Sequence, residues 1–316
     1  MSKKVTVYRI LAAVFLLGFL VCGYLIFFSN NCQSACAVPY SKYLDPSVGR
    51  ASKKDLIVNA QYARNYLTSV AKEHEDKFDM SIYFEYFPTG MNVAINPELK
   101  LWPASLTKLP VAMVTMKKIE DGTWHHDDEL VLLDQDIDPK SGDLYSSNSV
   151  GTRFTIDQLL QKLLVDSDNT AYRILYRNIE ARDFTDLINE VGLDELFDKE
   201  GKITAKEYSR LLRSLYFATF LNGENSEKII KLLTQSTFNK YLSAGLPVGV
   251  EFAHKYGENV DYNLFSDSGI VYVPHRPYIL SVMMQAKKGT ADEDGVEAEK
   301  IMKQISEKIY DYVSKY

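Results

Sequence analysis

An unbroken apolar run occupies residues 10–28, and after it hydrophobic positions recur at helix or strand spacing up to the C-terminus. Basic residues precede the run, and no acidic residue occurs before Asp45. A run of this length can cross the core of a bilayer, and a basic flank stays on the cytoplasmic side. The pattern therefore predicts a cytoplasmic tail over residues 1–9, one transmembrane helix over residues 10–28 and an extracytoplasmic remainder.

A cleaved signal peptide is the alternative to this anchor, because Ala35, Cys36 and Ala37 resemble a small-residue cleavage site. The apolar run is longer than the usual signal core and ends well before that site, so we favour an uncleaved anchor. Residues 29–54 contain the proline, glycine and polar spacing of a tether. Cys32 and Cys36 in this tether either close a small disulfide or remain two free thiols.

The periodicity after residue 54 alternates between helix and strand spacing. Helices are expected over residues 55–75, from Ser105 onward, over 155–165, through Tyr172 and Tyr176, and over 184–191, 204–221 and 295–313. Strands are expected over 80–87, through Val93 and Ile95, and over 249–253, 269–273 and 278–284. Strands near both ends, with terminal helices that must cover them, predict a mixed α+β domain over residues 55–316 in which the first and last helices cover an antiparallel sheet.

Composition and charge exclude several classes of partner and chemistry. A formal charge of −6 gives no basic stripe for a nucleic acid, and the absence of cysteine beyond the tether removes thiol catalysis and cysteine metal sites. Asp134, Asp136 and Asp138 imitate the start of a calcium loop, but Pro139 stands where the sharp-turn glycine belongs, so we expect a solvated loop. We expect neither a metal nor a cofactor.

Ser105 and Lys108 carry the first chemical signal. Their spacing of three puts both on one face of a helix that begins at Ser105, where the Lys108 amine can take the proton of the serine hydroxyl. A helix N-terminus also aims free backbone N–H groups at a developing oxyanion. Ser69 and Lys72 have the same spacing inside an ordinary surface helix. The pair alone therefore does not establish a nucleophile.

Two further stretches strengthen the hypothesis of a serine active site. Ser167-Asp168-Asn169 follows an apolar helical run, and Lys255-Tyr256-Gly257 follows a strand-like run. In this order, after Ser105-x-x-Lys108, they resemble the motifs of the penicillin-recognising serine hydrolases, that is, the class A β-lactamases and the related D-alanyl-D-alanine peptidases. The resemblance extends from about Ala60 to the C-terminus. It implies a β-lactamase/transpeptidase-like fold with an all-helical lobe beside the sheet and a site in the crevice between them.

The resemblance implies a role for the residues of the first two motifs. Ser105 would attack a strained lactam or a D-alanyl peptide bond and form an acyl-enzyme, with Lys108 as the base. Ser167 would relay a proton to the leaving nitrogen, and Asn169 would hydrogen-bond a substrate amide. Asp168 is expected to be a structural hydrogen-bond acceptor.

The third motif would bind the substrate. Lys255 would attract the substrate carboxylate, Gly257 completes the motif, and the backbone N–H groups of Ser105 and Glu258 would form the oxyanion hole. Tyr256 departs from the family, which usually has threonine or serine there. A large ring replaces the short hydroxyl that helps to hold the carboxylate, so an altered substrate is an open alternative.

A second departure concerns release of the acyl group. Class A β-lactamases carry a glutamate after the second motif, in an E-x-x-L-N pattern, that activates the deacylating water. No such pattern lies between Asn169 and Lys255, although Glu190, Asp194, Glu195 and Glu200 are in the neighbourhood. A missing general base costs about 10²- to 10⁴-fold, so the acyl-enzyme is expected to be long-lived.

The leading hypothesis is a membrane-anchored serine hydrolase with an extracytoplasmic catalytic domain that forms an acyl-enzyme at Ser105 with β-lactams and hydrolyses them slowly. The first alternative is a D-alanyl-D-alanine peptidase or penicillin-binding enzyme of cell-wall metabolism. The alternative of another class is a catalytically silent scaffold that grips cell-wall peptide. The expected partners are a β-lactam or a D-alanyl cell-wall peptide and, through the N-terminal helix, the membrane. We expect a monomer.

Overall fold

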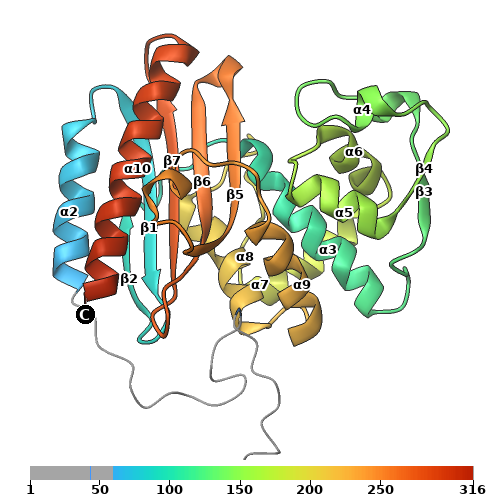
Figure 1. Ribbon diagram of the computed structural model, residues 1–316, viewed down its shortest axis with the longest axis horizontal. Helices are drawn as coiled ribbons and strands as arrows, with labels where there is room; N and C mark the ends of the chain where they lie inside the picture. Colours follow the sequence, from blue (N-terminus) through green and yellow to red (C-terminus); the bar gives the residue numbers. More distant parts are fainter. Residues whose placement is uncertain (1–42, 44–59, 316) are drawn as a thin grey trace, which may run out of the picture. The chain divides into compact units, whose positions relative to one another are not determined.

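The computed structural model describes Tyr43 and residues 60–315 (Figure 1). The expected cytoplasmic tail, the transmembrane helix, most of the tether, and Cys32 and Cys36 lie outside the described residues. Within the described part of the chain, no helix combines the length and the apolar character needed to cross a membrane. Tyr43, the one described residue of the tether, packs edge-on against Tyr272 of the α+β domain, with ring centroids 5.4 Å apart.

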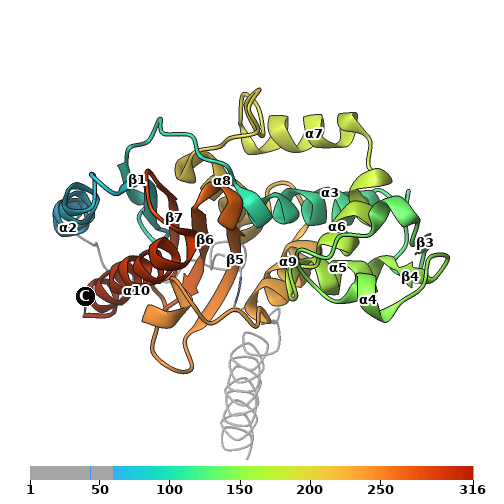
Figure 2. The ribbon, with the colours of Figure 1, turned by 90° about the horizontal axis from the view of Figure 1, so that it is seen from above.

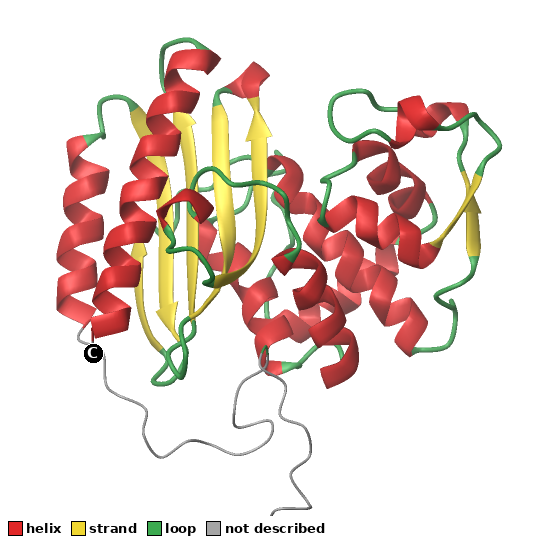
Figure 3. Cartoon of the chain, viewed as in Figure 1, coloured by secondary structure: helices red, strands yellow, loops and turns green. Residues whose placement is uncertain are grey.

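A five-stranded antiparallel sheet forms the first layer of the domain (Figures 1 and 3). Its strands are β1 (Phe78–Tyr86), β2 (Met91–Ile95), β5 (Glu251–Asn259), β6 (Leu264–Tyr272) and β7 (Tyr278–Ala286). The strand order is β2-β1-β7-β6-β5, so strands from the two ends of the domain are paired in the middle of the sheet. This arrangement confirms the predicted antiparallel sheet and leaves β5 at one edge.

Both faces of the sheet are apolar and covered. Ile82 and Phe84 of β1 belong to one buried cluster, whereas Tyr83 and Phe87 belong to another on the opposite side. The register pairs Ile82 with Val282 of β7, so residues of one face stay together across the sheet. Because both faces are covered, β1, β6 and β7 are buried along nearly their whole length and not only at alternating positions.

Two helices from the ends of the domain, α2 (Ala60–Glu73) and α10 (Ala291–Lys315), cover one face of the sheet (Figures 1 and 2). Ala63 and Leu67, one helical turn apart on α2, are buried there together with Ile305 of α10. Apolar side chains at this spacing form a stripe along one side of a helix. The first and last helices therefore cover the sheet as predicted.

The middle of the chain forms a helical lobe built around α3 (Lys108–Glu120) (Figures 1 and 2). Every residue of α3 from Lys108 to Met116 is buried, so this helix forms the centre of the lobe. The other elements are α4 (Leu144–Ser147), α5 (Ile156–Leu164), α6 (Asn169–Arg177), α7 (Ala181–Val191), α8 (Ala205–Phe217) and α9 (Gly223–Thr234), with a small sheet of β3 (Glu129–Val131) and β4 (Arg153–Thr155). The lobe is thus helical except for this strand pair.

The structure differs from the sequence expectations at several element ends and in elements that were not predicted. β5 continues past residue 253 to Asn259, because His254 and Lys255 are buried within the strand and do not end it. The sequence patterns predicted neither α9 nor the β3–β4 pair. The signal for α9 was Asn222, whose side chain caps the helix by accepting a hydrogen bond from the backbone N–H of Asn225.

Candidate active site

Ser105 lies in a 3₁₀ turn, Ala104–Thr107, that leads directly into α3. The α-helix therefore begins at Lys108 and not, as predicted, at Ser105. Ala104 has a φ of +47°, in the left-handed region that residues other than glycine rarely adopt. Such a conformation persists only where the surrounding structure imposes it, and it is enriched at functional sites. The turn presents Ser105 at the N-terminal end of a buried helix.

Lys108 is 2% exposed, and its Nζ lies among four oxygen atoms. These are Ser105 Oγ at 2.9 Å, Ser167 O at 2.6 Å, Ser167 Oγ at 3.1 Å and Asn169 Oδ1 at 2.6 Å. The carbonyl oxygens of Ser167 and Asn169 can only accept hydrogen bonds, so they bind two N–H groups of Lys108. A neutral amine then keeps its lone pair for the hydroxyl of Ser105.

Burial favours the neutral form of the Lys108 amine near physiological pH. It lowers the pKa of Lys108 to about 8, against an opposing effect of the Asp168 and Asp138 carboxylates. Burial also holds the pKa of Lys255 well below its ordinary value, and the charge of Lys108 adds to that shift. Two ammonium groups held this close disfavour each other's charged form. The site can therefore supply a base for Ser105.

Ser167 lies between the two lysines. Its Oγ accepts a hydrogen bond of 2.8 Å from Lys255 Nζ and lies 3.1 Å from Lys108 Nζ. Its φ of +56° is in the left-handed region, a second strained backbone position in the same site. Ser141 Oγ donates a 2.9 Å hydrogen bond to the carbonyl oxygen of Ser167. A hydroxyl held in this way can pass a proton to a group bound beside it.

Asp168 is fully buried and holds the second motif in place. Its Oδ1 accepts a 2.8 Å hydrogen bond from the N–H of Ala171 and caps α6, and its Oδ2 accepts one of 2.9 Å from the N–H of Leu144. A Cβ at Gly142 would lie 2.0 Å from Oδ2, so only glycine allows the 141–144 loop to approach. These contacts fit the predicted structural role of Asp168.

β5 passes directly beside the turn that carries Ser105. A Cβ added to Gly257 would lie 2.7 Å from Pro103 O and 3.1 Å from Ser105 N, so glycine permits this close approach. The next residue, Glu258, lines the same pocket as Ser105. An oxyanion hole made of the two backbone N–H groups requires such an arrangement.

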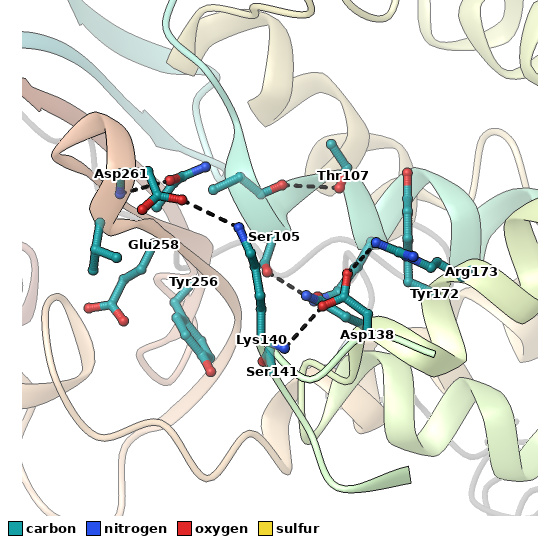
Figure 4. Close-up of a pocket in the computed structure, with 15 residues that line it drawn as sticks. Ser105, Thr107, Asp138, Lys140, Ser141, Tyr172, Arg173, Tyr256, Glu258 and Asp261 are labelled. Atoms are coloured by element: carbon teal, nitrogen blue, oxygen red, sulfur yellow. Dashed lines mark hydrogen bonds and ion pairs between the residues drawn. The ribbon is translucent and has the colours of Figure 1, made fainter. Parts of the chain in front are cut away.

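The ring of Tyr256 narrows the pocket at its Lys255 end. It stacks on Phe238 with centroids 3.6 Å apart and planes 7° from parallel. Its centroid lies 4.2 Å from Lys255 Nζ, and its side chain lines the pocket (Figure 4). The ring therefore occupies the place that the resemblance assigns to a small hydroxyl.

The sequence-predicted residues come together in one pocket of about 600 Å³ (Figure 4). Those that line it directly are Ser105, Lys108, Asn169, Tyr256 and Glu258. The remaining three, Ser167, Lys255 and Gly257, adjoin these residues through the contacts described above. None of the predicted site residues lies elsewhere.

Two ion pairs in the pocket were not predicted as part of the site. Asp138 pairs with Arg173 at 2.6 Å, and Lys140 pairs with Asp261 at 3.3 Å. Lys140 belongs to the helical lobe, whereas Asp261 lies in the turn Val260–Tyr262 that follows β5. The second pair therefore spans the pocket from one side to the other (Figure 4). No local sequence signal relates residues so far apart in the chain.

The prediction of a solvated acidic loop is wrong for two of its three aspartates. Asp136 is 1% exposed and pairs with Arg177 at 2.9 Å, and Asp138 is 9% exposed and pairs with Arg173. The two arginines are one turn apart on α6, and each contacts one of the two carboxylates. Among the described residues, no group of three potential ligands is arranged to hold a metal ion.

The last turn of α7 and the segment between α7 and α8 place no carboxylate in the pocket. Glu195 pairs with Lys100 at 2.9 Å, and Glu190 lines two other cavities. Asp194 and Glu200 are exposed, and none of the four acidic residues lines the pocket of Ser105. This part of the chain therefore holds no group placed to activate a water at the acyl carbon.

Comparison with known proteins gives matches over most of the chain. A family model described as "Beta-lactamase enzyme family" matches residues 62–313. The β-lactamase VEB-1 of Pseudomonas aeruginosa is 24% identical over 242 residues, which cover 69% of this chain and 80% of that protein. These matches confirm the resemblance drawn from the three motifs.

Solved structures show a shared fold. A substituted PBP-A, in an acyl-enzyme complex with penicillin G, matches with a TM-score of 0.72 and 18% identity. The match covers 81% of this chain and 97% of the PBP-A chain. A β-lactamase from Sphaerobacter thermophilus has a TM-score of 0.71 at 17% identity, covering 82% and 99%. An ancestral class A β-lactamase has a TM-score of 0.70 at 18% identity, covering 79% and 99%. The described domain thus has the class A β-lactamase fold.

Proposed function

Because the chain belongs to the β-lactamase enzyme family, we propose that it is a serine hydrolase that forms an acyl-enzyme at Ser105 with β-lactams. The observation that carries this proposal is the buried Lys108 Nζ at 2.9 Å from Ser105 Oγ. A substituted PBP-A, a protein of the same fold, forms an acyl-enzyme with penicillin G, which supports a β-lactam as the first substrate to test.

In the acylation step, neutral Lys108 takes the proton of the Ser105 hydroxyl as Oγ bonds to the lactam carbonyl carbon. The backbone N–H groups of Ser105 and Glu258 stabilise the oxyanion. When the C–N bond breaks, Ser167 gives its proton to the leaving nitrogen and regains one from Lys108 across the 3.1 Å contact. The hydrogen bond of 2.8 Å that Lys255 Nζ donates to Ser167 Oγ stabilises that oxygen as its proton leaves, which favours this transfer.

Deacylation is proposed to be slow. Removal of the acyl group needs a base that activates water, and no carboxylate of residues 190–204 lines the pocket. The carboxylates that line it already have partners, because Asp138 and Asp261 form ion pairs and Glu258 accepts a hydrogen bond from Tyr241. Loss of a general base costs about 10²- to 10⁴-fold in rate. The acyl-enzyme should therefore accumulate during turnover.

A D-alanyl-D-alanine peptidase or penicillin-binding enzyme of cell-wall metabolism is the second candidate. The missing water-activating carboxylate favours it, because such an enzyme is trapped by β-lactams and does not destroy them. A catalytically silent cell-wall scaffold remains the alternative of another class. Covalent labelling of Ser105 separates the scaffold from both enzymes.

We also propose that the enzyme is anchored in the cell membrane as a monomer with its catalytic domain outside. This rests on the sequence alone, with a tail over residues 1–9, an anchor over 10–28, a tether over 29–54 and the catalytic domain over 55–316. Membranes carrying the full chain should release it with detergent and not with high salt. Release by salt would contradict the anchor.

The test of acylation is intact-protein mass spectrometry of the full chain in detergent, mixed with benzylpenicillin and sampled over time. A mass increase equal to the drug that persists for hours supports acylation without efficient deacylation. A brief adduct with hydrolysed drug indicates a working β-lactamase. Neither adduct nor hydrolysis would contradict the proposal and favour the silent scaffold. Ser105→Ala is the control, and labelling in that variant would place the nucleophile elsewhere.

A further inference from the structure

Ser141 stands at the start of a short segment that binds the second motif through hydrogen bonds. Its carbonyl oxygen accepts the backbone N–H of Asn169 at 3.0 Å, and the N–H of Leu144 donates to Asp168 Oδ2 at 2.9 Å. The Ser141 hydroxyl binds Ser167 itself, because its Oγ donates to the Ser167 carbonyl oxygen at 2.9 Å. Ser141 also lines the pocket (Figure 4). The hydroxyl therefore contacts the residue whose proton the leaving group needs.

The backbone of Ser167 needs support from its surroundings. Its φ of +56° lies in the left-handed region, which a serine keeps only where the neighbouring structure imposes it. Lys108 Nζ donates to the Ser167 carbonyl at 2.6 Å, and this amine changes its charge when it takes or returns a proton. The Ser141 hydroxyl stays neutral through the same steps. It is therefore the constant donor to this carbonyl.

The backbone conformation of Ser167 decides where its hydroxyl lies. Its Oγ lies 2.8 Å from Lys255 Nζ and 3.1 Å from Lys108 Nζ, between the two amines. A change of φ to the ordinary negative range would turn the Cα–Cβ bond and carry Oγ away from both nitrogens. Misplacing a reacting group by about 1 Å can lower a rate by about 10²-fold. The hydrogen bond from Ser141 thus acts on the proton donor through its backbone.

We propose, resting on the acyl transfer proposed for Ser105, that Ser141 is a positioning residue that holds the Ser167 hydroxyl where it can protonate the leaving nitrogen. In that step the C–N bond breaks and the Ser167 proton goes to the nitrogen. Lys108 then gives Ser167 the proton that it took from Ser105. Ser141 keeps its own proton throughout, and no covalent bond to it forms or breaks.

A double-mutant cycle with Ser167 tests this role in the full chain. The acylation rate with benzylpenicillin is measured by intact-protein mass spectrometry. Ser141→Ala should lower this rate by about 10- to 10²-fold, because the Ser167 hydroxyl loses its position. Ser167→Ala removes that hydroxyl, so adding Ser141→Ala to it should change the rate by no more than about twofold. Losses that do not add are expected for two residues that act through one group.

Two further variants separate the hydroxyl from the shape of the side chain. Ser141→Thr keeps the hydroxyl and should acylate at the wild-type rate. Ser141→Val has nearly the shape of threonine without the hydroxyl and should be as slow as Ser141→Ala.

Ser146→Ala is the matched control. Ser146 Oγ also donates to a backbone carbonyl, that of Asp143 at 3.0 Å, but Ser146 is exposed and lies outside the pocket. Loss of this hydroxyl should leave the acylation rate unchanged.

The outcomes separate this inference from the proposed function. If Ser141→Ala slows acylation equally with and without the Ser167 hydroxyl, Ser141 supports the site in general and the inference is wrong, while acylation at Ser105 stands. A wild-type rate in Ser141→Ala, or equal rates in Ser141→Thr and Ser141→Val, would also overturn it. If benzylpenicillin does not acylate the wild-type chain, the proposed function fails and the inference fails with it. Should Ser141→Ala not fold, the comparison of Ser141→Thr with Ser141→Val decides in its place.

Discussion

Lys108 Nζ lies 2.9 Å from Ser105 Oγ, and the same nitrogen contacts the carbonyl oxygens of Ser167 and Asn169 at 2.6 Å each. Two acceptors that cannot donate bind two of its hydrogens, which leaves the third position for the serine hydroxyl. The arrangement suits a neutral amine that takes a proton from Ser105. The first predictions follow from this contact.

Lys108→Ala should lower the acylation rate by about 10²- to 10⁴-fold, because it removes the base and leaves the Ser105 hydroxyl unactivated. The rate is measured with a fluorescent penicillin, and near-ultraviolet circular dichroism checks that the fold is retained. Labelling at the wild-type rate in a folded variant would remove Lys108 from this role.

The chain supplies a matched control for that variant. Ser69 and Lys72 have the same spacing on α2, but Ser69 Oγ donates to the carbonyl oxygen of Tyr66, and both residues are exposed. Lys72→Ala should therefore leave labelling unchanged. A fall in labelling with Lys72→Ala would mean that loss of a lysine acts by some route other than the Ser105 site.

Acylation should rise with pH through an inflection near 8. The base must be neutral, and burial lowers the pKa of Lys108 from 10.5 to about 8. The rate should fall about tenfold per pH unit below the inflection and level off above it. The folded state also binds fewer protons than the unfolded state between about pH 8 and 10.5, so this group's contribution to stability rises with pH in that window. A flat acylation rate between pH 6 and 9 would contradict Lys108 as the base.

Asp168→Asn should destabilise the protein by about 1–3 kcal/mol, because both carboxylate oxygens accept backbone N–H groups and an amide nitrogen cannot. It should also shift the acylation inflection to lower pH, since the Asp168 charge raises the pKa of Lys108. Urea unfolding and the pH profile measure the two effects. Asp166→Asn, which breaks a half-buried pair with Lys162, should cost at most about 1 kcal/mol.

Gly257→Ala should reduce acylation by about 10²- to 10³-fold, comparable with the loss of one oxyanion-hole donor. Its Cβ would lie 2.7 Å from Pro103 O and 3.1 Å from Ser105 N, so β5 must move away from the turn. Overpacking should also cost about 1–3 kcal/mol of stability. Penicillin labelling and thermal unfolding measure the two losses. Gly295→Ala on α10, outside the pocket, should leave labelling unchanged, and equal losses in both variants would argue against a special role for Gly257.

Local patterns predicted the main elements correctly because they depend on neighbours along the chain. The apolar stripe with Ala63 and Leu67 on α2 marks a helix that covers a sheet, and the buried runs of β1 and β7 mark central strands. Element ends were less predictable, since they depend on caps. The side chain of Thr204, for example, accepts a hydrogen bond from the backbone N–H of Glu207, so Thr204 caps α8 and the helix itself begins at Ala205.

The part of the site that consists of short sequence motifs could be predicted. Ser105-x-x-Lys108, Ser167-Asp168-Asn169 and Lys255-Tyr256-Gly257 each lie in one stretch of chain, and the fold brings all three together. The two ion pairs in the pocket could not be found in this way. Lys140 and Asp261 meet only because the helical lobe and the turn after β5 lie on opposite sides of one pocket.

The sequence by itself determined most of the helices and strands, the antiparallel sheet between terminal helices, and the residues that can carry acyl transfer, because periodicity and motif spacing are local properties. Tertiary structure alone decided the environments of the two equally spaced serine–lysine pairs: Lys72 is exposed, whereas Lys108 is buried, and this burial lowers its pKa. It also decided that Tyr256 covers Lys255, because the ring is held by Phe238 from a distant loop. Desolvation and stacking depend on the residues that the folded chain places around a side chain, and local sequence patterns do not predict these contacts.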